Sequence, residues 1–141
     1  MTNFKLYNAN HGISAGDALL RQLTKCLQHY FPNALMAHLS ADNFAVLAPR
    51  KDWEKKLVAI EKEFQTLLDD HSVTSKAGIT LYEKLSAKSR QNPRHSFDTA
   101  KIAAGSIKQD ASRVYAYYTE DMGRQLLDEA YVLRNFETAL Q

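Results

Sequence analysis

The sequence predicts an α/β (α+β) fold in which helices cover a central sheet that contains a β-hairpin. Two observations lead to this prediction. Apolar residues recur at helical spacing in four stretches, and shorter apolar runs that are typical of strands lie between them. Two of these short runs are separated only by the polar tetrad 40–43, a pattern that is typical of a hairpin. Helices that alternate with strands in this order favour a sheet covered by helices.

The first part of the chain begins with the end of a strand, followed by a helix over about 15–31. The helix is predicted from apolar residues at helical spacing: Leu19, Leu20, Leu23, Leu27, Tyr30 and Phe31. Pro32-Asn33 ends it, because a proline disfavours helical conformation in the residue before it. The hairpin follows, with strands over Leu35 to Leu39 and Phe44 to Ala48.

A second helix is predicted over 52–70, with Asp52 as its cap. Its apolar stripe is the most regular in the chain: Trp53, Leu57, Ile60, Phe64, Leu67 and Leu68. The run from Val73 to Tyr82 is typical of a strand interrupted by Gly78, and the polar stretch 83–95 is predicted to be a loop.

The last part of the chain is predicted to form helix, strand and helix. Ser96 is positioned to cap a helix that ends near Ile107. Arg113 to Tyr118 alternates like a strand, and a final helix starts after Thr119. The apolar face of that last helix is formed by Leu126, Leu127, Ala130, Leu133, Phe136 and Leu140.

Composition excludes several classes of protein. The chain has 141 residues, of which 45% are hydrophobic and 24% charged, as expected for a folded domain and not for a disordered tail. A net charge of +2 predicts no nonspecific nucleic-acid binding. No apolar run is long enough to cross a bilayer, and a single cysteine, Cys26, suits a reducing cytoplasm. We therefore expect a cytoplasmic domain, or the cytoplasmic part of a membrane-anchored protein, with no membrane contact by this segment.

The usual signatures of catalysis are missing from the sequence. The histidines lie at no metal-ligand spacing from one another: His11, His29, His38, His71 and His95. There is no phosphate-binding loop or dinucleotide fingerprint, and no serine or cysteine lies in a nucleophile motif.

Three segments together resemble the GGDEF family, the diguanylate cyclase domains of bacterial cyclic di-GMP signalling. They are 4–20 (FKLYNANHGISAGDALL), 38–47 (HLSADNFAVL) and 75–80 (SKAGIT). The first follows the family pattern F-K-x-x-N-D-x-x-G-H-x-x-G-D-x-L-L without a gap. The second occupies the place of R-x-G-G-D-E-F, and the third resembles the S-x-G-I strand.

The resemblance implies a mainly antiparallel central sheet of about five strands flanked by helices, within a domain over 1–118 whose first strand is truncated. Residues 119–141 resemble the linker helix that joins such domains to a following EAL phosphodiesterase domain. The alternative is that this helix packs back on its own domain.

The hairpin departs from the family motif, since Ser40, Ala41, Asp42, Asn43 and Phe44 replace G-G-D-E-F. The family holds Mg²⁺ and the phosphates of GTP with carboxylates from this turn and from the first strand. Of these, Asp42 is kept as a metal ligand for nucleotide-bound Mg²⁺, while Asn43 replaces the glutamate and cannot ionise. The structural alternative is that Asp42 and Asn43 serve only as a normal pair of hairpin turn residues and bind no ligand. We therefore expect no catalytic residue here and negligible cyclase activity.

Guanine recognition is better preserved. The resemblance implies that Asn8 and Asp17 contact the guanine base, that backbone amides near Phe4 and Lys5 face the phosphates, and that Lys108 contacts a phosphate. The alternatives are structural: a helix-start carboxylate at Asp17, a turn residue at Asn8, and solvated lysines at the other two positions.

These features predict a catalytically impaired GGDEF domain that acts as a regulatory or GTP-binding module, attached to an EAL domain and able to form a homodimer. Two alternatives remain open at this level: an active diguanylate cyclase with an unusual hairpin, and a pure protein-interaction scaffold.

Overall fold

The computed structural model describes residues 1–68 and 73–140, and these fold into two compact units, Met1–Lys76 and Ala77–Gln141. Each unit combines helices with a two-stranded sheet, which confirms the mixed α/β (α+β) class. His71 and the last two positions of the helix predicted over 52–70 lie outside the described residues.

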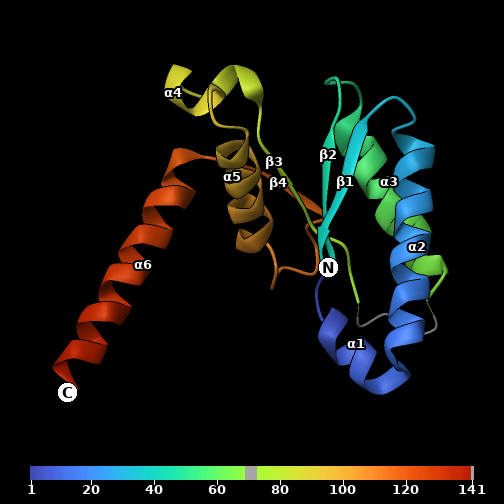
Figure 1. The fold of residues 1–141 in the computed structure, drawn as a ribbon, viewed down its shortest axis with the longest axis horizontal. Coiled ribbons are helices and arrows are strands. Elements are labelled where there is room, and N and C mark those ends of the chain that lie inside the picture. The colour runs from blue at the N-terminus through green and yellow to red at the C-terminus, as the bar shows by residue number, and fades with distance from the viewer. Residues whose placement is uncertain (69–72, 141) are drawn as a thin grey trace. The chain divides into compact units, whose positions relative to one another are not determined.

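The first unit packs three helices and a hairpin around one core (Figure 1). Its elements are α1 (Phe4–His11), α2 (Ile13–Tyr30), β1 (Leu35–Ser40), β2 (Asn43–Leu47) and α3 (Trp53–Thr66). Helices α2 and α3 lie side by side, and the core between them includes Leu23, Cys26, Ile60 and Phe64. Met36 and Phe44 join this core from the hairpin, so one face of the hairpin packs on the helices.

The hairpin is confirmed, with a tighter turn than the predicted tetrad. Strands β1 and β2 pair antiparallel from Leu35↔Leu47 to Ser40↔Asn43, which leaves only Ala41 and Asp42 in the turn. The pairing shifts between His38 and Ser40, as in a β-bulge.

The second unit packs α5 against a parallel pair of strands. Its elements are β3 (Ala77–Ile79), the 3₁₀ helix η1 (Tyr82–Lys84), α4 (Ala87–Arg90), α5 (Pro93–Ser106), β4 (Tyr115–Tyr117) and α6 (Glu120–Ala139). Gly78 pairs with Ala116 and lies directly against α5. A Cβ at Gly78 would overlap the carbonyl oxygen of Ala100 and lie 2.7 Å from the amide nitrogen of Ala104. Only glycine allows so close an approach of strand to helix.

The sheet differs from the expectation in its extent. The described residues contain four strands in two separate two-stranded sheets, in place of about five strands in one mainly antiparallel sheet. Of the strand predicted over 73–82, only Ala77–Ile79 pairs as a strand. The segment before it is anchored differently, because Thr74 exchanges hydrogen bonds with Thr2 near the start of the chain.

Several element boundaries were predicted incorrectly. Residues 4–11 form α1 where a strand end was expected, and α2 starts at Ile13 instead of residue 15. Asp52 is at the N-cap position of α3, but its backbone is left-handed (φ 52°) and its side chain makes no capping hydrogen bond. A capping residue normally has an extended backbone, so the expected cap cannot form in this conformation.

The predicted loop over 83–95 is partly helical. Ser86 caps α4 by accepting from the amide of Ser89, and α5 begins at Pro93, before the expected start at Ser96. The cap of α5 is Asn92, whose side chain accepts from the amide of Arg94 at 3.1 Å. Proline fits the first turn of a helix because its fixed φ is helical and its missing N–H would have no partner there.

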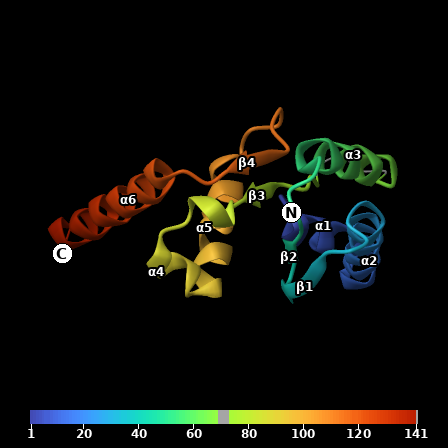
Figure 2. The same cartoon turned by 90° about the horizontal axis from the view of Figure 1, so that it is seen from above.

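The last helix, α6, forms as predicted and touches the rest of its unit mainly at its start. Met122 packs on the small core of Ala103, Ile107 and Ala116, and beyond it α6 extends away as a single helix (Figures 1 and 2). Within the described part of the chain, no helix has the length and apolar character that crossing a membrane requires.

Candidate functional site

Two of the predicted site residues, Asn8 and Asp17, lie near the corner where α1 turns into α2. The two helices meet at Gly12, whose φ of 87° favours glycine and whose amide donates to the carbonyl of Asn8 at 2.8 Å. This sharp turn folds α1 back onto the first turns of α2, so that the Asn8 side chain lies against Gly16. A Cβ at Gly16 would overlap Asn8 Oδ1 and lie 2.8 Å from its Cγ.

The carboxamide of Asn8 is buried without a partner for its oxygen. Among the side chains that the structure describes, Asn8 Oδ1 alone is a buried polar atom with no hydrogen bond. Such an atom loses its contact with water and gains nothing in return, which costs about 1–3 kcal/mol. Unpaired polar groups of this kind are rare and are often explained by a ligand or a water molecule.

Asp17 follows Gly16 on α2 and is exposed. It is the fifth residue of the helix, since α2 starts at Ile13, so it is neither the N-cap nor a residue of the first turn. The structural alternative for Asp17, a carboxylate that stabilises the helix start, is therefore wrong. Its position beside Gly16 places it next to the residue that Asn8 packs on.

The hairpin turn carries the second group of predicted site residues. Ala41 has a φ of 44°, a left-handed conformation that costs a non-glycine residue about 1 kcal/mol or more. Ser40 ends β1, Asn43 starts β2, and the Phe44 ring stacks on His38 with centroids 4.5 Å apart. The backbone thus keeps the shape that a glycine would favour, with an alanine in its place.

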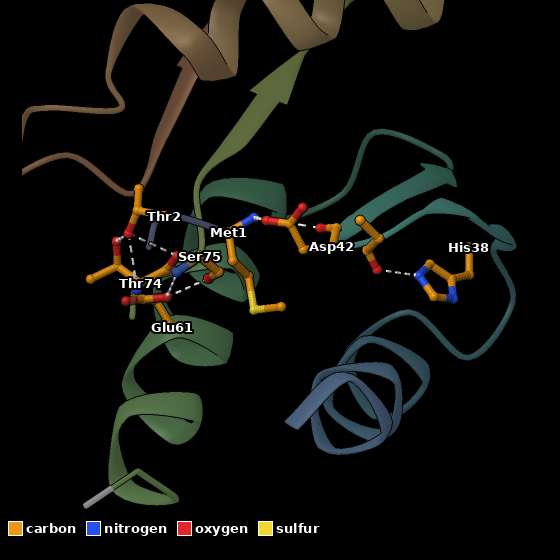
Figure 3. A network of polar contacts seen from close by, with 8 residues as sticks. Met1, Thr2, His38, Asp42, Glu61, Thr74 and Ser75 are labelled. Atoms are coloured by element: carbon orange, nitrogen blue, oxygen red, sulfur yellow. Dashed lines mark hydrogen bonds and ion pairs between the residues drawn. The ribbon is translucent and has the colours of Figure 1, made fainter. Parts of the chain in front are cut away.

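Asp42 points toward the start of the chain. Its carboxylate lies 2.6 Å from the α-amino nitrogen of Met1 (Figure 3). Three residues span at most about 11 Å, so Asp42 lies close to the first turn of α1. The first amides of a helix have no partner within it, which makes this turn able to face a phosphate.

A network of polar contacts holds Thr74 and Ser75, which precede β3, close to the start of the chain. The amide of Thr2 donates to the carbonyl of Thr74 at 2.8 Å, and the two hydroxyls lie 2.6 Å apart. The carboxylate of Glu61 accepts from both the amide and the hydroxyl of Ser75 (Figure 3). These contacts fix the segment that precedes α1 to the core of the unit.

The remaining predicted residues have different surroundings. The Phe4 side chain is 8% exposed and belongs to the core, so only its backbone is available to a ligand. Lys5 is exposed on α1. Lys108 is exposed just after α5, in the second unit. That unit also has a cavity of about 330 Å³ between the end of β3 and the start of α6, which none of the predicted site residues lines.

A magnesium site is not formed by the residues that the structure describes. No three histidine, cysteine, aspartate or glutamate side chains within residues 1–68 and 73–140 lie together as ligands. Asp42 supplies one carboxylate, and its neighbour Asn43 supplies only a neutral amide. Magnesium needs several hard oxygen ligands, so Asp42 would hold it only together with the phosphates of a nucleotide.

Comparison with known proteins identifies the family. The family model "Diguanylate cyclase, GGDEF domain" matches residues 1–113. The chain belongs to this family, whose domains act in cyclic di-GMP signalling. No curated protein matched the sequence.

One solved structure shows the same fold. It is the GGDEF domain of TpbB (also called YfiN) from Pseudomonas aeruginosa, in a shortened form that comprises only this domain. The match has a TM-score of 0.64 and 23% sequence identity, and it covers 89% of this chain and 76% of the other.

Gly16 is the site residue that the sequence analysis did not single out. The sequence did contain a signal for this residue, because Gly16 lies between Asn8 and Asp17 in the first motif. What could not be seen is that α1 folds back so that Asn8 packs directly on Gly16.

Proposed function

We propose that this chain is a catalytically impaired GGDEF domain that serves as a GTP-binding regulatory module in cyclic di-GMP signalling. The observation that carries the proposal is a contrast between two ends of the site. At the α1–α2 corner, the buried and unpaired oxygen of Asn8 lies against Gly16, and the exposed Asp17 is the next residue along α2. At the hairpin turn, Asp42 is left as a lone carboxylate beside Asn43.

The α1–α2 corner suits a guanine base. A carboxylate at Asp17 can accept hydrogen bonds from both the N1–H and the exocyclic amine of guanine. The amide group of Asn8 can donate from its nitrogen to an acceptor of the base, while its oxygen stays packed on Gly16. Adenine lacks an N1–H and carries no amine at the same position, so the Asp17 carboxylate favours GTP over ATP.

The hairpin turn suits catalysis poorly. Joining two GTP molecules builds negative charge on the phosphoryl oxygens, which cations must neutralise. Losing one well-placed contact to such a transition state costs about 3 kcal/mol, roughly a hundredfold in rate. Here Asn43 replaces an ionisable glutamate, and both turn glycines are lost. GTP therefore binds without rapid turnover.

The domain would act on a neighbour through its last helix. We place the boundary of the module after residue 118, with α6 as a linker to a following EAL phosphodiesterase domain. The small contact between α6 and its own unit at Met122 supports a connecting role over a purely structural one.

Calorimetry with GTP tests the nucleotide site. We expect saturable binding of GTP that exceeds binding of ATP, and a loss of at least tenfold in affinity for Asp17→Ala, since hydrogen bonds to a charged group contribute about 1.5–3 kcal/mol. Asp98→Ala is the matched control, because Asp98 is also an exposed carboxylate on a helix, in the second unit. Affinity that is unchanged in Asp17→Ala would disprove the guanine site.

A second assay tests the loss of activity. The chain is incubated with GTP and Mg²⁺, and the products are separated by chromatography. We expect GTP to remain intact over hours. Sustained formation of cyclic di-GMP would show an active cyclase, and absence of any GTP binding or thermal stabilisation would show an interaction scaffold.

A further inference from the structure

Helix α6 carries a row of leucines that nothing in the described chain covers. Leu126, Leu133 and Leu140 are 50%, 63% and 73% exposed. They follow one another at intervals of seven residues. Ala130 lies four residues after Leu126 and three residues before Leu133. This is the heptad spacing of a coiled-coil seam, with leucine at the d position and Ala130 at an a position.

The charges beside this seam specify a partner. With the leucines at d, Glu129 takes the g position of one heptad and Arg134 takes the e position of the next. In a parallel pair of helices, g of one helix lies beside the next e of the other, so Glu129 meets Arg134 of a second copy, and the reverse contact forms as well. In an antiparallel pair, g faces g and e faces e, so that Glu129 would face Phe136 and Arg134 would face Leu127. Only the parallel arrangement pairs opposite charges.

We propose that α6 binds α6 of a second copy of this chain as a parallel, two-stranded coiled coil along Leu126, Leu133 and Leu140. The proposal goes beyond nucleotide binding and does not depend on it. Leucine at d favours two strands in parallel coiled coils that carry β-branched residues at a, whereas here Gly123 and Ala130 occupy a positions, so the leucines supply most of the seam. Glu137 occupies an a position within the seam, and a polar residue there lowers stability, so the association is expected to be weak and reversible.

Other partners fit this helix less well. Its sequence has five carboxylates, from Glu120 to Glu137, and only two arginines. An anionic lipid surface would repel it, because membrane-binding helices are rich in lysine and arginine on their polar face. Packing on its own unit ends near Met122 and leaves the seam exposed.

Sedimentation velocity of the 141-residue chain over a range of concentrations tests the proposal. We expect the weight-average mass to rise from 16.0 kDa toward twice that value. Leu133→Asp should weaken association about 100-fold, which corresponds to about 2.8 kcal/mol, since one leucine is lost from each copy. Val132→Asp is the control: Val132 is also 63% exposed, but it lies off the seam.

Charge reversal tests the pairing itself. Glu129→Arg and Arg134→Glu should each weaken association, because each places like charges side by side, and the double variant should restore it. Circular dichroism checks that every variant keeps its helix content. A chain that stays monomeric at all concentrations overturns the proposal. So does equal weakening by Leu133→Asp and Val132→Asp, or a double variant as weak as the single ones.

Orientation is tested by cross-linking. In a Cys26→Ser background, a cysteine introduced by Leu140→Cys lies next to its own copy only in a parallel pair. We expect a disulfide-linked dimer on mild oxidation. Dimers that form by sedimentation but do not cross-link would overturn the parallel arrangement.

Discussion

At the scale of single residues, Gly16 determines how Asn8 is held. A glycine inside a helix costs about 1 kcal/mol relative to alanine, so its presence in α2 needs a reason. The reason is steric, since Asn8 occupies the space that a Cβ would take. The sequence motif pointed to Asn8 and Asp17, but it could not reveal this packing, because it depends on the angle at which α1 meets α2.

Gly16→Ala should therefore disturb the site more than the fold. The overlap with Asn8 Oδ1 costs about 1–3 kcal/mol, partly offset by about 1 kcal/mol of better helix propensity. We expect a net loss of stability up to about 2 kcal/mol by denaturant unfolding and at least a tenfold weaker affinity for GTP, because Asn8 must leave its position.

Two comparisons make this prediction specific. Gly105→Ala in α5 has open space around its Cβ and should stabilise its unit by about 0.5–1 kcal/mol. Adding Gly16→Ala to Asn8→Ala should not destabilise the protein further, since the clashing side chain is gone. If Gly16→Ala is as harmless as Gly105→Ala, Asn8 does not pack on Gly16.

At the scale of elements, the long periodic patterns predicted helices well and the boundaries less well. Helix α3 and the hairpin followed directly from their apolar spacing. The start of α5 did not, because a proline preceded by polar residues resembles a loop. Only the structure shows that Pro93 lies in the first turn, with Asn92 as the cap. Helix α1 was missed because its eight residues carry little amphipathic pattern, and its formation depends on packing Phe4 into the core.

The cap of α5 gives a test of that correction. Asn92→Ala removes the acceptor for the amide of Arg94 and should cost about 1 kcal/mol. Ser96→Ala should change stability by less than about 0.5 kcal/mol, because Ser96 lies within the helix and caps nothing. Thermal unfolding followed by circular dichroism measures both. The reverse order of the two effects would restore Ser96 as the start of the helix.

At the scale of the whole molecule, the chain divides into two units, and each has its own small core. The family motifs are divided between them, since the hairpin and Asn8 lie in the first unit and Lys108 in the second. No motif could predict that division, because it depends on how each part packs its own core. Unfolding of the whole chain therefore need not be a single transition. Trp53 is the single tryptophan and packs against the first core, so its fluorescence reports on that unit alone.

Cys26 makes the stability of the first unit sensitive to high pH. The thiol is 3% exposed and donates to Glu63, and burial together with this carboxylate raises its pKa from 9.0 to about 11. Between these values the unfolded chain has released the proton and the folded chain still holds it, so stability is fully present below pH 9 and is lost as pH rises toward 11. A shift of this size corresponds to about 3 kcal/mol.

We expect Trp53 fluorescence in urea to show this loss in the wild-type chain and a shallower decline in Cys26→Ala, which has no thiol to ionise. The pKa of Tyr30 is also raised, chiefly because its hydroxyl bonds to Glu63. Tyr30 is present in both proteins and Cys26 is the smallest cause of its shift, so its titration largely cancels in the difference between them. The comparison uses the slope of stability against pH, and not stability at one pH, because removing the buried sulfur also leaves a cavity. Parallel slopes for the two proteins from pH 8 to 11 would show that the Cys26 thiol ionises freely in the folded state, and the close packing of α2 on α3 around Glu63 would then be incorrect.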